Sequence, residues 1–419
     1  MGAMKIIAAS MLYTSGRPPL EGGAVVVRDG RIIAVGSLGD VKSEFHLPVE
    51  EYPGCVIMPG MVNAHTHLEL THFPAWKLRK GLDYAPRTYV DWIIQVIKLR
   101  RGLDRSELEH SVREGARISL ESGTTTIGEI LTDLSLLPLY RQLGVSGRFY
   151  CEAIGQSAQQ SLDRRTAIAE ALTSFTGDTL FPGISPHAPH TLSGEFLGDL
   201  VAFAEQHSLP LMIHLAESAE EVEFCFDSSG KIAEQLYPFV GWESYLPAPR
   251  RVSPAGLLQA AGGLTPRTSA VHCVHVTPAD VACMREHGAS IVLCPRSNER
   301  LAVGAPPFML FKSAGIPLAV GTDSLASNDS LSVWDEIRYL YERFPRLFSP
   351  DELLALATAG GARALHLEQD AGTLEPGRLA NIQVIQPAGP LDKGRVAATL
   401  LEAGTLHAVY RMGEIVHSL

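Results

Sequence analysis

The sequence predicts an α/β chain: a (β/α)8 barrel with a small β-sandwich domain formed by both chain ends. Between about residues 58 and 371, short apolar segments alternate with longer segments that carry apolar residues at helical spacing. The two ends differ, being rich in β-branched residues separated by Gly and Pro turns. The predicted domains are therefore 1–57 plus 372–419 for the β-sandwich and 58–371 for the barrel.

Eight candidate strands occur in the central region. In chain order they read "VIMPGMVNAHTH", "TTTIGEI", "GRFYCEAIG", "LFPGISPH", "LMIHLAES", "SAVHCVHV", "ASIVLCP" and "PLAVGTDS". The segments between them, such as "SELEHSVREGARISLESG", have the spacing of amphipathic helices. Repeated β-then-α units of this number are typical of a TIM barrel, whereas a doubly wound sheet rarely needs eight.

The β-rich segments at the two ends of the chain share one pattern, in which two strands flank a short turn. "VVVRDGRIIAVG" has an Asp-Gly turn between two strands, and "TLHAVYRMGEIV" repeats the pattern near the other end. We expect them to pair into one small domain. The segment from Glu220 to Pro266, between the fifth and sixth strands, is longer than one helix requires and predicts a lid or pocket wall.

Composition narrows the classes of function. The net charge of −11 argues against nucleic acid or an anionic membrane as the main partner. No apolar run approaches the ~18 residues that cross a bilayer. Six scattered cysteines without CxxC spacing indicate free thiols in a reducing cytoplasm. We therefore expect a cytoplasmic protein that acts on a small molecule; the sequence leaves homo-oligomerisation open.

Polar side chains at the strand ends predict a metal site. His65 and His67 end the first strand and, being two residues apart, face the same way. His214 ends the fifth strand and Asp323 the eighth. A single strand-end histidine is more often a core residue, but four ligands at the chemically active ends of barrel strands favour one divalent ion. Zinc is our first choice and ferrous iron the second.

Two further residues complete the predicted machinery. Glu217 lies three positions after His214, where a carboxylate can reach over the metal. His272 ends the sixth strand, while His275, an odd number of residues away, is expected to pack outside the site.

These motifs resemble the amidohydrolase superfamily, in its deaminase and chlorohydrolase branch. The resemblance is carried by "PGMVNAHTHLE", "GTTTIGE", "SPHAPHTLS", "HLAES", "HCVH", "CPRSN" and "GTDSLASNDSLSVWDEIR" and covers nearly the whole chain. It implies one divalent metal on His65, His67, His214 and Asp323, with Glu217 and His272 as catalytic groups. Two-metal relatives carry a lysine at the end of the fourth strand, and "LFPGISPH" has none.

The chemistry expected of such a site is hydrolytic deamination. A divalent ion lowers the pKa of a bound water toward neutrality. Asp323, as a ligand with a free oxygen, is expected to take the proton of this water, and His272 to orient the water and stabilise an oxyanion. Glu217 is expected to protonate the ring nitrogen next to the amine, so that ammonia can leave.

The substrate expectation rests on three stretches. "SPHAPHTLS" resembles the "HAPYT" loop of adenosine-type deaminases, in which His187 matches a purine or ribose contact. Adenosylhomocysteine-type deaminases hold the ribose with a glutamate about nine residues after the tryptophan; counted from Trp92, that position is Arg101, preceded by Arg100. A guanidinium pair suits a carboxylate, although a solvated helix end explains it equally well.

"HTHLELTHF", "WIIQVIKLR" and "RFYCEAIG" are similar to the aminofutalosine deaminases of menaquinone biosynthesis, whose substrate joins an adenine nucleoside to a benzoate. The first choice is therefore 6-aminodeoxyfutalosine. The candidate contacts are Glu69, Arg100, Arg101, Arg148 and His187. A carboxylate at a helix start is an equally favoured interpretation of Glu69.

The alternatives keep the fold. They are an S-adenosylhomocysteine, 5′-methylthioadenosine or adenosine deaminase, a guanine or cytosine deaminase, and a triazine-type chlorohydrolase. A non-catalytic scaffold is disfavoured because all four ligands, Glu217 and His272 are present.

Overall fold

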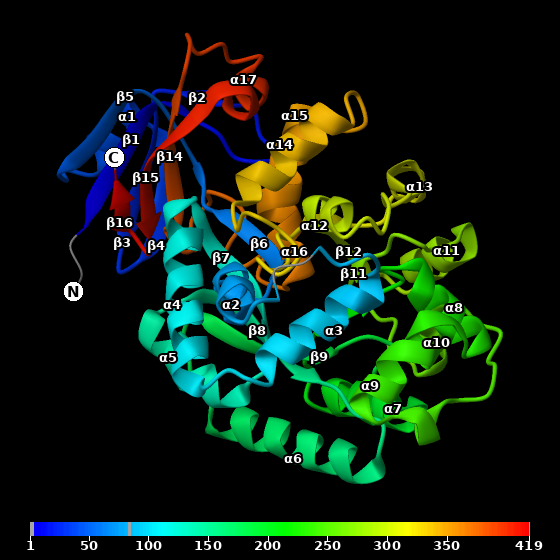
Figure 1. Cartoon of the computed structure of the whole chain (residues 1–419). Helices are drawn as coiled ribbons and strands as arrows, with labels where there is room; N and C mark the ends of the chain where they lie inside the picture. Colours follow the sequence, from blue (N-terminus) through cyan, green and yellow to red (C-terminus); the bar gives the residue numbers. More distant parts are fainter. Residues whose placement is uncertain (1–3, 83–84, 419) are drawn as a thin grey trace. The chain divides into compact units, whose positions relative to one another are not determined.

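A computed structural model describes residues 4–82 and 85–418. Eight parallel strands form a nearly closed barrel in chain order, with β6 and β13 at the ends of the sheet (Figure 1). Their bounds are Met61–Thr66 (β6), Thr124–Leu131 (β7), Ser146–Ala153 (β8), Leu180–Pro186 (β9), Leu211–Leu215 (β10), Thr268–His272 (β11), Ser290–Leu293 (β12) and Leu318–Val320 (β13). An isolated parallel bridge between Thr66 and Asp323 joins the two end strands. The predicted barrel and all eight predicted strands are confirmed.

Helices follow the strands, as in any (β/α)8 barrel. They are α2 (Phe73–Arg79), α3 (Tyr89–Arg100), α4 (Arg105–Glu121), α5 (Leu137–Leu143), α6 (Ala158–Ser174), α7 (Gly194–Gln206), α8 (Ala219–Asp227), α9 (Tyr237–Val240), α10 (Pro254–Ala260), α11 (Pro278–Glu286), α12 (Pro295–Arg300), α13 (Phe308–Ala314), α14 (Val333–Arg343), α15 (Pro350–Ala355) and α16 (Gly361–Ala364). Short 3-10 turns lie at Leu68–Leu70 (η1), Leu134–Leu136 (η2) and Glu243–Tyr245 (η4), and π-helical turns at Ile232–Leu236 (η3) and Leu356–Gly360 (η5).

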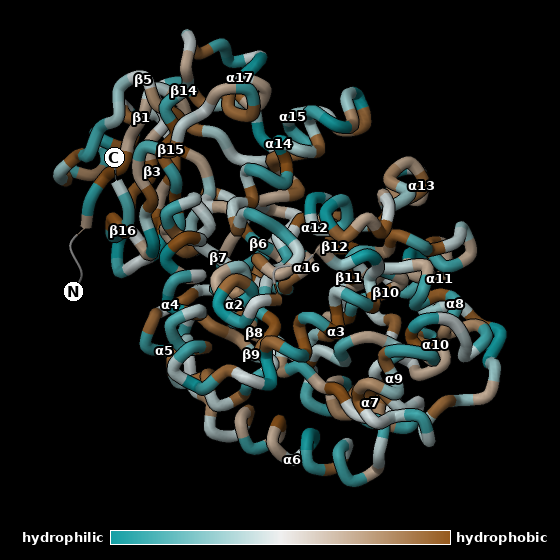
Figure 2. Tube along the Cα trace, viewed as in Figure 1, coloured by the Kyte–Doolittle hydropathy of each residue, from teal (hydrophilic) through white to brown (hydrophobic). Residues whose placement is uncertain are grey.

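The helices follow amphipathic patterns. In α7, Phe196, Leu200 and Phe203 are buried while Glu195 and Asp199 are exposed, which is the 3.6-residue period of a helix packed on one side. Hydrophobic and hydrophilic stretches alternate in the same way along the neighbouring helices (Figure 2). Ser193 begins α7 by accepting the backbone N–H of Phe196, so the helix start is capped where the sequence provides a serine.

A second, mixed sheet is built from both chain ends, in the order β16-β15-β14-β5-β1-β3-β4, with β2 paired to β1. The strands are Lys5–Leu12 (β1), Leu20–Glu21 (β2), Gly23–Arg28 (β3), Arg31–Ser37 (β4), Val49–Pro59 (β5), Ile382–Pro387 (β14), Gly404–Arg411 (β15) and Glu414–Ser418 (β16); α1 (Leu38–Glu44) and α17 (Val396–Ala403) accompany them. The predicted pairing of the two ends is confirmed by β5 and β14, which run antiparallel with Ile57 opposite Val384.

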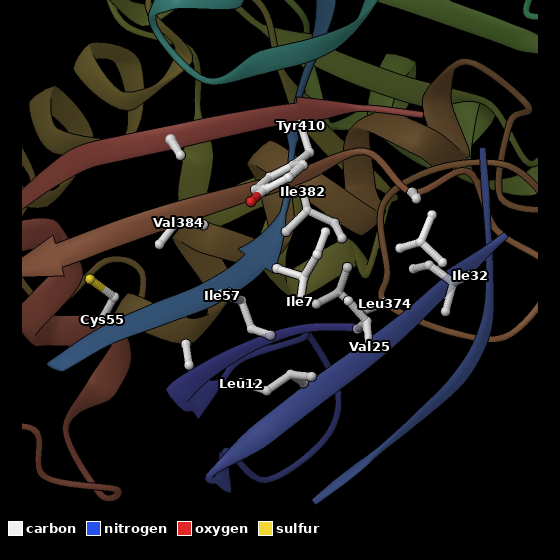
Figure 3. Close-up of a cluster of buried hydrophobic side chains, with 14 residues drawn as sticks. Ile7, Leu12, Val25, Ile32, Cys55, Ile57, Leu374, Ile382, Val384 and Tyr410 are labelled. Carbon is white, nitrogen blue, oxygen red and sulfur yellow. The ribbon is translucent and has the colours of Figure 1, made fainter. Parts of the chain in front are cut away.

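The central strands β1 and β3 of the terminal sheet are buried on both faces. Ile7, Val25 and Ile382 point into one apolar cluster (Figure 3), whereas Ile6 and Val26, one residue away along the same strands, belong to another. Successive residues of a strand face opposite sides of the sheet. Because both sides are buried here, apolar residues follow one another without interruption in the sequence.

The chain divides into two compact units. One comprises Met1–Ala64, Arg117–Ile127 and Ser332–Leu419, and the other His65–Ala116 and Gly128–Leu331. The domain boundaries that the sequence places after residues 57 and 371 are not tested by this division and stay predictions. All residues of the candidate site described below belong to the second unit. In the described part of the chain, no helix is both long and apolar enough to cross a membrane.

Candidate active site

The four predicted metal ligands lie together at the carboxyl ends of the barrel strands. Nε2 of His67 is 3.2 Å from Nε2 of His65 and 3.4 Å from Nε2 of His214. Oδ1 of Asp323 is 3.7 Å from Nε2 of His65 and 3.5 Å from that of His67. Three imidazole nitrogens and one carboxylate oxygen that face a common point form a donor set suited to zinc or iron(II).

Neighbouring groups orient these ligands. Nδ1 of His214 is 2.8 Å from the backbone oxygen of His187, so Nδ1 carries the proton and Nε2 is left to coordinate. Asp323 has a positive φ of 58°, which is unfavourable for a residue with a Cβ. Hydrogen bonding to β6, the first strand of the barrel, holds the backbone in this conformation. Gly321 allows this approach, because a Cβ there would lie 2.7 Å from the backbone of His65.

Burial sets the charge of the cluster. It lowers the pKa of His67 to about 4 and that of His65 well below its usual value, so both imidazoles are neutral. Burial alone would raise the pKa of Asp323, but the surrounding imidazoles hold it well below its usual range. Neutral histidines and an ionised aspartate are the protonation states that ligate a metal.

The second oxygen of Asp323 is not free, which corrects the expectation from the sequence. Oδ2 accepts hydrogen bonds from Oγ of Ser297 at 2.7 Å and from Oγ of Ser327 at 2.6 Å. These serines turn Oδ1 toward the histidines. Asp323 is therefore placed well as a ligand, and less well as the acceptor of a water proton.

Glu217 and His272 face each other beside the ligand cluster. Oε1 of Glu217 lies 3.7 Å from Nε2 of His272, and Oε2 accepts the hydroxyl of Tyr89 at 2.9 Å. Both side chains are buried, and burial raises the pKa of Glu217 to about 7. A carboxyl group with this pKa can hold and release a proton at neutral pH, as a general acid must.

The tautomer of His272 follows from its partner. Nδ1 lies 2.9 Å from Oδ1 of Asn298, so it donates its proton there, and Nε2 presents a lone pair. Burial also lowers the pKa of His272, which keeps the ring neutral. This arrangement suits the predicted water-orienting role. It does not suit the predicted stabilisation of an oxyanion, which requires an N–H donor.

A cavity opens over these groups. It is lined by His67, Leu70, Tyr89, Trp92, Ile93, Val96, Ile97, Arg100, Thr132, Glu152, Ile154, His187, Thr191, His214, Glu217, Leu236, Val240, Trp242, His272, Asp323 and Ser324. Helix α3 supplies a largely apolar wall. The segment 220–266 supplies Leu236, Val240 and Trp242, as expected for a pocket wall.

Comparison with known proteins identifies the family. Residues 56–416 match the amidohydrolase family. The chain belongs to the amidohydrolase family. It is a hydrolase that acts on carbon–nitrogen bonds, as the sequence predicted.

Two curated relatives match most of this amidohydrolase. An aminodeoxyfutalosine deaminase from Deinococcus radiodurans is 29% identical over 374 residues, covering 86% of this chain and 85% of the relative. A 5-methylthioadenosine/S-adenosylhomocysteine deaminase from Nitratidesulfovibrio vulgaris is 30% identical over 403 residues, covering 92% and 84%. A zinc-bound adenosine deaminase from Xanthomonas campestris shares the fold, with a TM-score of 0.81, 24% identity and coverage of 99% and 92%.

Only part of the predicted substrate set lines the cavity of this amidohydrolase. His187 does, with Nδ1 3.0 Å from Oγ1 of Thr191. Arg100 does too, and Nη2 lies 2.5 Å from Oε2 of Glu69. Glu69 is buried and does not line the cavity, and its Oε1 accepts hydrogen bonds from the backbone N–H groups of Thr132 and Asp133. Because these bonds fix its carboxylate, Glu69 positions the guanidinium group of Arg100.

The other two arginines lie elsewhere. Arg101 is exposed and stacks over Phe239, 5.0 Å from the ring centre, because consecutive helix residues point about 100° apart. Arg148 shares a face of β8 with Glu152 but lies four residues, roughly 13 Å, nearer the start of the strand. Its guanidinium donates to the backbone oxygen of Pro182. The structure therefore separates both arginines from the cavity.

Three site residues are absent from the predicted set. Glu152 could have been found, since it stands at the end of the third strand, as the ligands do at theirs. Asn298 ends the motif "CPRSN", which could have drawn attention to it, whereas Tyr89 comes from helix α3 and no quoted motif marks it.

Proposed function

We propose that this amidohydrolase is a metal-dependent deaminase of an adenine nucleoside. The observation that carries the proposal is the juxtaposition of the histidine and aspartate cluster with Glu217, whose buried carboxyl group faces the same cavity. The names of the two curated relatives, both nucleoside deaminases, support the reaction class.

His65, His67, His214 and Asp323 would hold one divalent ion, with zinc as the first choice. The donor set supports zinc, and the structural relative from Xanthomonas campestris is described with zinc bound. When bound, the ion supplies Lewis acidity and makes water a stronger nucleophile near neutral pH.

The protein groups divide the proton transfers. The lone pair on Nε2 of His272 is placed to accept a hydrogen bond from the attacking water and to orient it. Oε1 of Glu217 is buried and makes no hydrogen bond to the described residues, so it is available to protonate the ring nitrogen beside the amine. Tyr89 holds the other oxygen of the carboxyl group, which fixes the direction in which Glu217 points.

For the substrate we propose 6-aminodeoxyfutalosine, which would place the enzyme in menaquinone biosynthesis. Arg100 is the only arginine or lysine among the described residues that line the cavity. Its planar group can bind the carboxylate of an aryl substituent on the 5′ carbon. The apolar wall formed by Trp92, Ile93 and Val96 suits the aryl ring.

A second candidate, 5′-methylthioadenosine or S-adenosylhomocysteine, is favoured by another observation. Arg100 is already paired with the buried carboxylate of Glu69, so part of its charge is compensated before any ligand binds. A methylthio group would then need only the apolar wall. The relative from Nitratidesulfovibrio vulgaris carries this name.

Ammonia release from a series of nucleosides tests the proposal. The series comprises 6-aminodeoxyfutalosine, 5′-methylthioadenosine, S-adenosylhomocysteine and adenosine, with guanine and cytosine as free-base comparisons. Chloride release from a chlorotriazine is measured in parallel. The highest kcat/KM is expected for 6-aminodeoxyfutalosine. Equal or higher values for 5′-methylthioadenosine or S-adenosylhomocysteine would reject that substrate and favour the second candidate. Activity restricted to guanine, cytosine or the chlorotriazine would reject the nucleoside class.

A further inference from the structure

One buried carboxyl group next to the proposed proton donor has no role in the reaction described above. Glu221 lies in the first turn of α8, is fully buried and does not line the cavity. Its Oε1 accepts a hydrogen bond from the backbone N–H of Ala216 at 3.0 Å, and its Oε2 accepts one from the backbone N–H of Glu217 at 2.9 Å. The two oxygens therefore bind consecutive peptide groups, and the second of these belongs to Glu217.

Helix capping does not account for these two bonds. Ser218 begins α8, and its side chain accepts the backbone N–H of Glu221. A glutamate or glutamine at this place ordinarily accepts the backbone N–H of the capping serine in return, as Gln160 does in α6 and Glu352 does in α15. The side chain of Glu221 instead reaches past the serine to the two residues before it. Its bonds thus hold the segment between β10 and α8, which carries Glu217.

This segment has an unfavourable backbone conformation. Ala216 has a positive φ of 50°, which residues with a Cβ rarely adopt. A backbone bend of this kind can turn consecutive N–H groups toward a common side, where the two oxygens of one carboxyl group can accept both. Glu221 supplies these oxygens. Its removal would leave both N–H groups without their acceptor and allow the bend to relax.

The position of Glu217 is consequently fixed at two points. Glu221 holds its backbone N–H, and the hydroxyl of Tyr89 holds Oε2 of its side chain. The remaining oxygen, Oε1, is the atom assigned above to the ring nitrogen. A group that transfers a proton has to lie within hydrogen-bond distance of its target, and a displacement of about 1 Å can cost about 10²-fold in rate.

We propose that Glu221 is a positioning residue of the deamination, which aims Oε1 of Glu217 at the ring nitrogen by holding the backbone of Glu217. This inference rests on the proposed function, because it takes Glu217 to be the proton donor. The hydrogen bonds of Glu221 go to residues 216–218 and not to the metal ligands. Its removal should therefore slow the chemical step and leave metal content and substrate binding close to native.

The test measures kcat and KM of the metal-loaded enzyme on the best nucleoside of the series above. Glu221→Gln keeps the shape of the side chain, but its amide nitrogen cannot accept an N–H, so one of the two bonds is lost. Its kcat should fall about ten- to a hundred-fold while KM changes less than about three-fold. Glu220→Gln, which removes the neighbouring carboxyl group from the same helical turn, is the matched control and should keep native kinetics.

A second comparison separates positioning from general support of the fold. Glu221→Gln is added to Glu217→Gln, which has no proton donor left to misplace. The additional loss in kcat should then be less than about three-fold, whereas independent effects would multiply. Where Glu221→Gln does not fold, Glu221→Asp, which keeps both acceptor oxygens on a shorter side chain, takes its place in the same comparisons. Metal content and thermal unfolding are measured for each variant.

The outcomes distinguish this inference from the proposed function. An unchanged kcat in the Glu221 variant would overturn this inference alone. A loss that is equally large in the Glu217→Gln background, or a loss of metal, would also overturn it, because either result indicates a structural role. A native enzyme that deaminates no nucleoside would overturn the proposed function, and this inference with it.

Discussion

Oδ1 of Asn298 lies 2.9 Å from Nδ1 of His272, and this contact decides which nitrogen of the imidazole faces the cavity. With Nδ1 donating its proton, Nε2 carries the lone pair beside Glu217. His272 also has a positive φ of 70°, so the backbone at the end of β11 is held in an unfavourable conformation to aim the ring.

Removal of this contact should slow turnover without loss of metal. Asn298→Ala leaves Nδ1 without its acceptor, so the ring can adopt the other tautomer, and kcat is expected to fall about 10–100-fold. Asn298→Asp keeps an acceptor for the Nδ1 proton and should retain more activity than the alanine variant. Steady-state kinetics together with metal analysis check this prediction; an alanine variant as active as the native enzyme would show that the tautomer is unimportant.

The ligand cluster predicts about one tightly bound divalent ion per chain. The donor atoms of His65, His67, His214 and Asp323 lie 3.2–3.7 Å from their neighbours in the cluster, and β9 carries no lysine that could bridge a second ion. His65→Ala should lose most of the metal, because Nε2 of His65 is one of three converging nitrogens. Elemental analysis of purified protein measures the ratio. Two ions per chain in active native protein would contradict the single-ion site.

Glu217→Gln should separate proton transfer from metal binding. The amide matches the carboxyl group in shape but cannot pass a proton, so turnover should fall by about 10²–10⁴-fold. Metal content and thermal stability should stay close to native, since Glu217 is predicted to be no ligand. Glu223→Gln, on the exposed side of α8, is the matched control and should leave kinetics unchanged. Loss of metal from Glu217→Gln would reassign the residue to the ligand set.

The two adjacent arginines of α3 provide a test of substrate choice. Arg100 lines the cavity and Arg101 does not. Arg100→Gln should reduce kcat/KM for 6-aminodeoxyfutalosine by about ten- to a hundred-fold while changing that for 5′-methylthioadenosine little. Arg101→Gln should change neither. Since Arg100→Gln leaves the buried Glu69 unpaired, Arg100→Lys serves as the variant that keeps the charge. A parallel loss on both substrates would mean that Arg100 only supports the fold.

The sequence was most informative where short-range geometry determines position. His65 and His67 had to face the same way because side chains on a strand alternate, and the structure places their Nε2 atoms 3.2 Å apart. The sequence was less informative where tertiary packing determines which side chain enters the cavity. Which of Arg100 and Arg101 enters the cavity depends on the rotation of α3, and Arg148 lies on a site-forming strand but near its opposite end.

The partners of site residues that come from helices could not be assigned from the sequence. Tyr89 reaches Glu217 across 128 positions of sequence, and Asn298 reaches His272 across 26. Neither distance follows from local periodicity. The hydrogen bonds on Oδ2 of Asp323 were missed for a similar reason, since they depend on how α12 and the loop after β13 meet.

In the proposed reaction, water replaces an amino group on a nucleoside base. The most direct measurement is turnover of 6-aminodeoxyfutalosine and 5′-methylthioadenosine in ¹⁸O-labelled water, followed by mass spectrometry of the product and assay of ammonia. We expect one ¹⁸O atom on the base and one ammonia released for each molecule of product. The absence of ammonia and of label from every adenine nucleoside, together with halide release from a chlorotriazine, would contradict it.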